Sequence, residues 1–446
     1  MIVILHGWSD THGSFRRLGR RLVQDGITTH VKHIRLGDYV SMDDEVTFDD
    51  IAHAMQRAWD REGLPTTPRS VDVVVHSTGG LVARHWMTSF YTPATNPIHR
   101  LLMLAPANFG SPLAHKGRSF IGRVVKGFKS DKLFQTGTQI LKGLEIASPF
   151  SWNLAMRDRF VQDAWYGPGR VLCTVLVGTD GYSGIAAAAN EEGTDGTVRV
   201  ATANLNAAVV DFNFATDPQN PPTPTVREAN GLTAFARIPR DNHSTIALKD
   251  SGPNNDSVLA FIKRALTVND ATFPALIADL NTFSEKARLA GSMKRFTHGY
   301  QDTVVRLQDD MGQFICDYFL EVFSKTPDEK KVDDSLTRTI QEETLSKVHV
   351  YGANTAYRSL LFNTTVMNEL LTKKNRSLYV SVTAMPDIRK TRTVGYSTFG
   401  FDDIGSIKLN PARILKMFQA DRTVLVDMKI RREQTDSVFR LMPLDD

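Results

Sequence analysis

The apolar residues of the first 268 positions fall into short runs that alternate with amphipathic stretches. The runs are rich in valine, isoleucine and leucine and predict buried strands. The expected strands are residues 2–5, 29–35, 73–75, 101–105, 170–178 and 235–239. Helical spacing of apolar residues predicts helices at residues 15–25, 49–62, 81–87 and 257–266. This alternation predicts the α/β class, with a mostly parallel sheet covered by helices on both faces.

Beyond residue 268 the pattern changes from helical spacing to a period of two. Apolar and polar side chains alternate most clearly over residues 423–430. Further strands are expected at residues 313–323, 348–351, 357–362, 378–383 and 437–441. Repeated short strands with turns between them are typical of a β-sandwich. We therefore expect two domains: an α/β domain at residues 1–268 and a β-rich accessory domain at residues 269–446.

The composition is that of a globular protein and excludes several classes. The chain has 446 residues, which is too long for one ordinary domain. Hydrophobic residues make up 41% and charged residues 23%. The net charge of +4 is too small to indicate a nucleic-acid partner, and we expect none.

The apolar segments and the cysteines give expectations about location. Residues 2–5 are a short apolar run with no basic residue before it, which does not fit a signal peptide. No apolar run reaches the roughly 18 residues of a transmembrane helix. Cys173 and Cys316 lie far apart in apolar runs, so we expect two buried thiols and no disulfide. We expect synthesis in the cytoplasm, and export without a cleavable signal stays open.

The strongest chemical signal lies in residues 71–84. Three valines at 73–75 predict a buried strand, Ser77 follows it, and Gly79 and Gly80 precede a helical stretch. Strand, serine, small residues and helix are the layout of a nucleophile elbow, in which the serine lies on a sharp turn above the sheet. Glycine suits this turn because a side chain there would collide with neighbouring elements.

The segment 76–80 (His-Ser-Thr-Gly-Gly) resembles the Gly-His-Ser-x-Gly-Gly motif of α/β-hydrolase lipases and esterases. The sequence departs from the motif at Val75, where the family has glycine or sometimes alanine. The resemblance covers residues 1–268 and implies an α/β-hydrolase fold in which Ser77 is the nucleophile.

Half of an oxyanion hole is expected at the end of the first strand. Residues 2–5 lead into His6-Gly7, and an apolar strand that ends in His-Gly is similar to the segment that builds the hole in these lipases. A glycine lets the backbone approach a reacting carbonyl closely. The resemblance implies that the backbone N–H groups of Trp8 and Thr78 form the hole.

The resemblance also implies the acid and the base of a catalytic triad. The general base lies in the loop after the last strand, where His243 follows residues 235–239. The acid often lies in an Asp-Gly-x-Val segment, which Asp195 begins. Asp180 stays open as an alternative, because either Asp-Gly pair could also be an ordinary turn. The order Ser77, Asp195, His243 is the order of this fold.

Two other histidines and a calcium site need consideration. His85 and His99 lie in stretches read as helical and are weaker candidates for the base. Some bacterial lipases bind structural calcium through an aspartate just after the catalytic histidine, but Ser244 and Thr245 occupy that place here. We therefore expect no metal, and we expect no cofactor.

A cap or lid is expected at about residues 112–168. The segment 106–114 resembles the one that precedes the cap in many lipases. Residues 115–146 then carry seven lysines and arginines against Asp131 and Glu145, with apolar residues at helical spacing among them. A basic amphipathic helix is a candidate membrane-surface element, and a solvated helix packed on the body is the alternative.

These features predict a serine ester hydrolase of the lipase, esterase or phospholipase type. We expect an acyl ester or lipid as substrate, with peripheral contact to a membrane surface and no transmembrane segment. One alternative is a non-catalytic lipid- or protein-binding module on a hydrolase-like fold, which Val75 favours. Another is an acyltransferase, in which an alcohol replaces water and the same triad acts. Residues 269–446 contain no catalytic constellation.

Overall fold

The computed structural model describes residues 1–5, 15–34, 44–114, 137–249, 251–291, 297–384 and 405–432. The chain forms two compact units, each assembled from three stretches of sequence. The α/β unit consists of Met1–Ala207, Glu228–Asp302 and Ala420–Thr423. The β-rich unit consists of Ala208–Arg227, Thr303–Gln419 and the chain from Val424.

The α/β unit is built on a six-stranded sheet in the order β2-β1-β3-β4-β5-β8. Its strands are β1 (Ile2–Leu5), β2 (Val31–Ile34), β3 (Val71–His76), β4 (Ile98–Leu104), β5 (Leu172–Gly178) and β8 (Ala234–Ile238). Every neighbouring pair is parallel, which confirms the predicted parallel sheet. The chain reverses its direction of travel across the sheet between β1 and β3. Ligands of such sheets bind beyond the carboxyl ends of the strands at this switch point.

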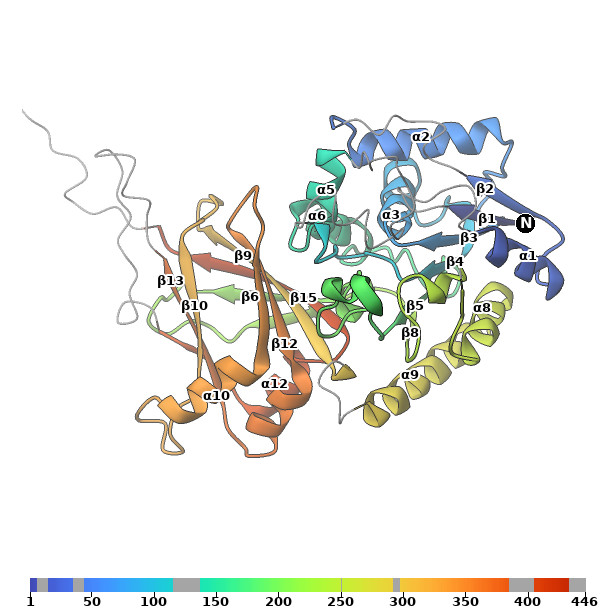
Figure 1. Ribbon diagram of the computed structural model, residues 1–446. Helices are drawn as coiled ribbons and strands as arrows, with labels where there is room; N and C mark the ends of the chain where they lie inside the picture. Colours follow the sequence, from blue (N-terminus) through green and yellow to red (C-terminus); the bar gives the residue numbers. More distant parts are fainter. Residues whose placement is uncertain are drawn as a thin grey trace, which may run out of the picture. The chain divides into compact units, whose positions relative to one another are not determined.

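Helices cover both faces of this sheet (Figure 1). They are α1 (Arg16–Gln24), α2 (Phe48–Arg61), α3 (Gly79–Phe90), α5 (Thr138–Leu144), α6 (Pro149–Asp158), α7 (Val200–Ala203), α8 (Ser257–Thr267) and α9 (Phe273–Ala290), with 3₁₀ turns at η3 (Gly184–Ala189) and η4 (Thr245–Ala247). The packed group of α2, α3 and α6 lies on one face, and α8 lies against β4 and β5 on the other. None of the helices in the described ranges is both long and apolar enough to span a bilayer.

A buried ion pair joins α3 to the end of α6. Arg84 donates from Nε and Nη2 to the two carboxylate oxygens of Asp158, at 2.7 and 2.9 Å, and from Nη1 to the carbonyl of Asn108 at 2.7 Å. The Tyr166 hydroxyl donates to the same carboxylate at 2.8 Å. Both charged side chains are fully buried, so each requires the other in place of lost hydration. Burial opposes the charge of Arg84, but Asp158 outweighs it and raises the pKa of the guanidinium.

The β-rich unit contains two sheets. The larger has the order β11-β12-β9-β15-β6-β7 and the smaller the order β10-β13-β14. The strands are β6 (Ala208–Asn213), β7 (Thr225–Glu228), β9 (Tyr300–Asp309), β10 (Tyr318–Phe323), β11 (Leu345–Val350), β12 (Tyr357–Asn363), β13 (Leu378–Ala384), β14 (Ile407–Leu409) and β15 (Arg422–Ile430). The helices are α10 (Asp334–Thr344), α11 (Thr364–Met367) and α12 (Pro411–Met417), with a π-helical turn η6 (Asn368–Thr372) after α11.

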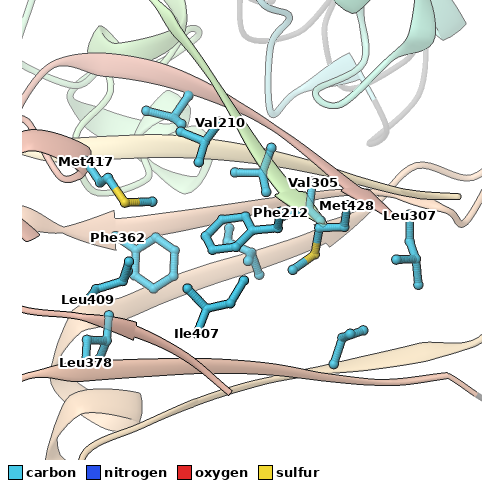
Figure 2. Close-up of a cluster of buried hydrophobic side chains, with 14 of the residues drawn as sticks. Val210, Phe212, Val305, Leu307, Phe362, Leu378, Ile407, Leu409, Met417 and Met428 are labelled. Atoms are coloured by element: carbon cyan, nitrogen blue, oxygen red, sulfur yellow. The ribbon is translucent and has the colours of Figure 1, made fainter. Parts of the chain in front are cut away.

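Side chains from both sheets of the β-rich unit share one hydrophobic core (Figure 2). Val210 and Phe212 of β6 and Met428 of β15 enter it from the larger sheet, and Leu378 and Ile407 enter it from the smaller. In β6 and β15 every second residue belongs to this core, as the period of two predicts. The expected β-rich character is therefore confirmed, and the two layers face each other as in a sandwich.

The predicted boundary at residue 268 differs from these units in three places, one of which is the return of Ala420–Thr423 to the α/β unit. Residues 208–227 belong to the β-rich unit, because β6 pairs in parallel with β15, more than two hundred residues later. Helix α9 and the chain up to Asp302 belong to the α/β unit, because α9 packs on β8. Local periodicity does not report such distant pairing, and neither β6 nor α9 was predicted.

The predictions for the two cysteines, the cap and the strand at residues 437–441 have different outcomes. Cys173 is buried in β5 as expected, but Cys316 is exposed, in the irregular stretch just before β10. Of the expected cap at 112–168, the structure gives α5 and α6, while residues 115–136 lie outside the described residues. The expected strand at 437–441 also lies outside them.

We predict that Arg84→Met lowers the free energy of unfolding of the α/β unit by about 3–5 kcal/mol, because it leaves the Asp158 carboxylate buried and unpaired. Urea denaturation measures the change. The double variant Arg84→Met/Asp158→Leu should be less destabilised than the single one. Arg21→Met, which breaks an exposed pair with Asp25, is the control and should cost no more than about 1 kcal/mol. A loss of 1 kcal/mol or less for Arg84→Met itself would contradict this account.

Candidate active site

Ser77 occupies a sharp turn between β3 and α3. Its φ of 55° is left-handed, which strains a residue with a Cβ by about 1–2 kcal/mol. Hydrogen bonds on both sides fix the turn: the Ser77 N–H donates to the carbonyl of Leu104 at 3.2 Å. The Ser77 carbonyl accepts from the N–H groups of Gly80 and Ala107, both at 3.1 Å. The turn has the strained geometry of a nucleophile elbow.

Two neighbouring positions show how the sequence permits this turn. A Cβ on Gly80 would lie 2.7 Å from Cβ of Pro106, so only glycine fits without movement. Val75 is fully buried in β3, and Ser77 is left-handed two residues later. Valine at the departure from the family motif therefore does not prevent the elbow.

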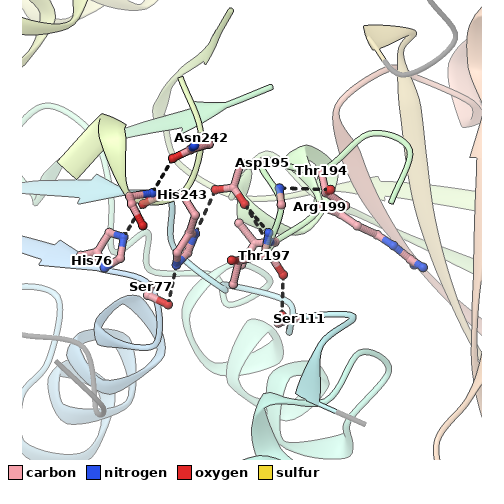
Figure 3. Close-up of polar contacts among 12 residues, drawn as sticks. His76, Ser77, Ser111, Thr194, Asp195, Thr197, Arg199, Asn242 and His243 are labelled. Carbon is pink, nitrogen blue, oxygen red and sulfur yellow. Dashed lines mark hydrogen bonds and ion pairs between the residues drawn. The ribbon is translucent and has the colours of Figure 1, made fainter. Parts of the chain in front are cut away.

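His243 lies in the loop after β8 and reaches Ser77 (Figure 3). Its Nε2 is 3.0 Å from Ser77 Oγ, and its Nδ1 is 3.0 Å from a carboxylate oxygen of Asp195. Because a carboxylate only accepts, Nδ1 carries the proton. Nε2 of the neutral ring is then the acceptor for the serine hydroxyl. Asn242 shapes this loop, since its side-chain oxygen accepts the N–H groups of the two residues after His243, each at 3.0 Å.

Asp195 is fully buried in a tight turn, and its carboxylate is held from two sides. One oxygen accepts the N–H groups of Thr197 and Val198 at 2.9 and 2.8 Å, and the other faces His243. Asp180, the alternative, is exposed at the end of β5 and accepts the N–H of Arg240 at 3.1 Å. Of the two carboxylates, Asp195 is the one in contact with His243.

The other predicted residues lie as follows. Thr78 is buried at the start of α3, and Trp8 lies outside the described residues. His85 is buried between Asp49 at 2.6 Å and Arg157 at 2.9 Å. Burial lowers the pKa of His85, although its hydrogen bond to Asp49 acts in the opposite direction. His99 lies at the start of β4, 3.9 Å from Asp72, and not in a helix as expected. Among the histidines of the described ranges, His243 is the one within hydrogen-bond distance of the Ser77 hydroxyl.

Sequence reasoning missed one role at the elbow. His76 is buried, and its Nε2 donates to the backbone carbonyl of His243 at 2.9 Å. The two imidazole rings have centroids 4.5 Å apart, and the ring of Phe15 lies 5.5 Å from that of His76 on another side. The residue before Ser77 thus fixes the loop that carries His243. The motif at 76–80 contained His76, but nothing in it indicated this partner.

The sheet and the geometry around Ser77 and His243 define the fold class of the α/β unit. A parallel sheet covered on both faces, a left-handed serine between strand and helix, and a histidine in the loop after the last strand give the α/β unit the α/β-hydrolase fold. The expectation from the sequence is confirmed at the level of fold.

Comparison with proteins of known structure supports the assignment of this fold. No protein-family model matches the chain, and no curated protein sequence is similar to it. Two solved structures of the phospholipase PlaB from Legionella pneumophila, one in complex with thio-NAD, are similar with a TM-score of 0.79 and 23% identity. The alignment covers 100% of this chain and 96% of PlaB. A Bacillus licheniformis lipase, BlEst2, aligns over 46% of this chain and 78% of its own, at 18% identity and a TM-score of 0.29. At these identities the PlaB likeness concerns the fold, and it spans both units.

We predict that Gly80→Ala destabilises the α/β unit. Alanine gains roughly 1 kcal/mol of helix propensity over glycine. Overpacking against the rigid Pro106 ring costs about 1–3 kcal/mol and outweighs that gain. Gly352→Ala is the control, because its Cβ would meet nothing within 4 Å, and it should stay within about 0.5 kcal/mol of the parent. Chemical denaturation of both variants checks this, and an equally stable Gly80→Ala would show that the elbow has room for a side chain.

Proposed function

We propose that this protein is a serine ester hydrolase in which Ser77, His243 and Asp195 act as nucleophile, general base and orienting acid. The observation that carries the proposal is the continuous chain of contacts Ser77 Oγ–His243 Nε2 and His243 Nδ1–Asp195, each at 3.0 Å, at a left-handed serine turn. These distances lie within the reach that nucleophile and base require.

Each group has a defined task in this mechanism. Ser77 Oγ attacks the ester carbonyl while His243 Nε2 takes its proton, and the resulting imidazolium gives that proton to the leaving alcohol. Water then attacks the acyl-enzyme with the same histidine as base, which releases the acid and restores Ser77. Asp195 keeps the ring oriented and stabilises its charged form. The N–H groups of Thr197 and Val198 hold the Asp195 side chain in this orientation.

The developing oxyanion needs donors near Ser77. Thr78 begins α3, and the first N–H groups of a helix have no partner within the helix. The twelve-residue helix also directs its positive end toward this position. We assign the hole to the backbone N–H groups of Thr78 and Trp8. Such donors lower the barrier by a few kcal/mol.

The proposed substrate is an acyl ester of a lipid, and a phospholipid in particular. The fold likeness to the phospholipase PlaB over both units supports this choice. The basic residues of segment 115–146, predicted as a membrane-surface element, suit an anionic interface, where each lysine or arginine contributes about 1 kcal/mol. Contact with a membrane surface is part of the proposal.

We predict that Ser77→Ala abolishes hydrolysis of a short soluble acyl ester and of phospholipid vesicles. The loss should be on the order of 10³-fold or more, because removal of the nucleophile leaves only residual binding and oxyanion effects. Steady-state hydrolysis with the two substrates measures it. A fluorophosphonate probe should label the parent on Ser77 and leave the variant unlabelled.

The same experiment separates the alternatives. Unchanged turnover in Ser77→Ala, or no turnover and no labelling in the parent, would contradict the hydrolase proposal and favour a non-catalytic module. Transfer of the acyl group to an added alcohol in preference to water would identify an acyltransferase. If the soluble ester is hydrolysed but the phospholipid vesicles are not, the proposal of a lipid substrate is wrong.

Asp195→Asn should lower kcat for the soluble ester by about 10²- to 10⁴-fold, because an amide no longer fixes the Nδ1–H tautomer of His243. Asp180→Asn is the matched control: Asp180 also precedes a glycine, but it contacts the Arg240 N–H. It should stay within a factor of about three of the parent, as expected of an exposed change away from the reacting groups. The reverse ranking would move the acid to the end of β5.

A further inference from the structure

The turn that carries Asp195, here called the acid turn (residues 191–199), is closed by its own hydrogen bonds. The Asp195 N–H donates to the carbonyl of Val198 at 3.0 Å, and Thr194 forms a β-bridge with Arg199. The Thr194 hydroxyl donates to the carbonyl of Glu191 at 2.7 Å. The direction of the Asp195 carboxylate therefore depends on where the two ends of the turn, at Glu191 and Arg199, are held.

The guanidinium of Arg199 holds both ends. It donates from Nε and Nη2 to one carboxylate oxygen of Glu191, at 3.2 and 2.5 Å, and from Nη1 to Asp302 at 2.6 Å. The side chains of Arg199 and Asp302 are almost completely buried, and that of Glu191 is only 12% exposed. Burial opposes the charge of Arg199, but Glu191 and Asp302 outweigh it, and the pKa of the guanidinium is raised. The guanidinium of Arg199 therefore keeps its positive charge inside the bridge.

Tyr300 and Ser111 also contact the acid turn. Gly193 has a φ of 67°, and a Cβ there would lie 2.6 Å from the ring of Tyr300. The Tyr300 hydroxyl donates to Glu192 at 3.1 Å. On another side, Ser111 donates to the carbonyl of Thr197 at 2.6 Å (Figure 3). The acid turn is thus held by Ser111 on one side and by the segment Tyr300–Asp302 on the other.

We propose that Arg199, bridging Glu191 and Asp302, is a positioning residue that fixes the Asp195 carboxylate against His243. The proposal rests on the function proposed above. Arg199 donates to Glu191 and Asp302, which hold the acid turn, so we assign its effect on the reaction to the position of that turn. Asp302 lies 103 residues further along the chain, at the last residue of the α/β unit before the chain enters the β-rich unit.

The connection gives Asp302 a particular place. The returning segment Ala420–Thr423 also belongs to the α/β unit, and Asp421 donates its N–H to the carbonyl of Tyr300 at 2.7 Å. Thr423 donates to the carbonyl of Ala201, just past the acid turn, at 3.0 Å. The orientation of Asp195 is therefore determined in part by the two short segments through which the chain leaves and re-enters the α/β unit.

The test compares Asp302→Asn, Glu191→Gln and Arg199→Lys in the full-length chain. Each keeps the approximate size of the side chain but weakens the bridge. A displacement of about 1 Å at a reacting group reduces the rate on the order of 10²-fold, so we expect kcat for a soluble ester to fall by roughly 10- to 100-fold with KM nearly unchanged. Asp427→Asn is the control, because its pair with Arg306 at 3.0 and 2.8 Å lies wholly within the β-rich unit.

Non-additivity separates positioning from general damage. In the Asp195→Asn background the carboxylate that the bridge orients is already lost, so Asp302→Asn should cause less than a twofold further change in kcat. A merely structural role would lower activity by the same factor in both backgrounds. If Asp302→Asn does not fold, as judged by its thermal unfolding, Glu191→Gln decides by the same criteria.

A spectroscopic readout keeps this proposal distinct from the function itself. The proton on His243 Nδ1, bonded to Asp195, gives a far-downfield resonance that Asp195→Asn should remove. We expect the resonance to be lost or broadened in Asp302→Asn and kept in Asp427→Asn, whether or not the ester is hydrolysed. A parent that shows this pattern but does not hydrolyse esters overturns the proposed function alone. A parent that hydrolyses esters, with unchanged kcat and resonance in Asp302→Asn and Glu191→Gln, overturns the positioning role alone.

Discussion

The backbone of Ser77 is held in a left-handed conformation that is energetically unfavourable for serine. The candidate site is arranged around that turn. The strain is offset locally, through the carbonyl of Leu104 on one side and the N–H groups of Gly80 and Ala107 on the other. Gly80, just after the turn, leaves the room that Pro106 needs, because a Cβ there would lie 2.7 Å from Cβ of Pro106. A parallel sheet supplies the rigid frame for this, because β3 is paired along both edges.

Buried charge is used twice in the α/β unit, with different consequences. Arg84 and Asp158 tie α3, the helix that follows the serine, to α6, and their effect is on stability. Arg199, Glu191 and Asp302 tie together the acid turn, and the proposed effect of this bridge is on the direction of the Asp195 carboxylate. In both cases desolvation makes a partly broken bridge worse than none, so the geometry is restricted to one arrangement. Restricting geometry is what a hydrogen-bonded serine, histidine and aspartate require.

The sequence was sufficient where the signal is local. The valines before Ser77, the Asp-Gly-Thr-Val segment at Asp195 and the loop position of His243 each identified a residue that the structure brings into one contact chain. It was insufficient where a partner is distant. The pairing of β6 with β15 cannot be predicted from the hydrophobic periodicity of either strand. The bridge from Arg199 to Asp302 likewise cannot be predicted from the sequence around either residue. Helix α9 was missed because its buried positions, Phe273, Leu276 and Leu280, are few among eighteen residues.

The interleaving of the two units also constrains the order of events during synthesis. Strand β6 leaves the ribosome more than two hundred residues before β15, its parallel partner, and must wait while the rest of the β-rich unit is made. At translation rates of about 5–20 residues per second this delay lasts on the order of ten seconds or more. Thr423 and Asp421, which bond to Ala201 and Tyr300, arrive in the same late interval. A nascent chain would therefore expose the edge of β6 that pairs with β15 in the meantime, and its α/β unit would be completed only when Ala420–Thr423 have been made.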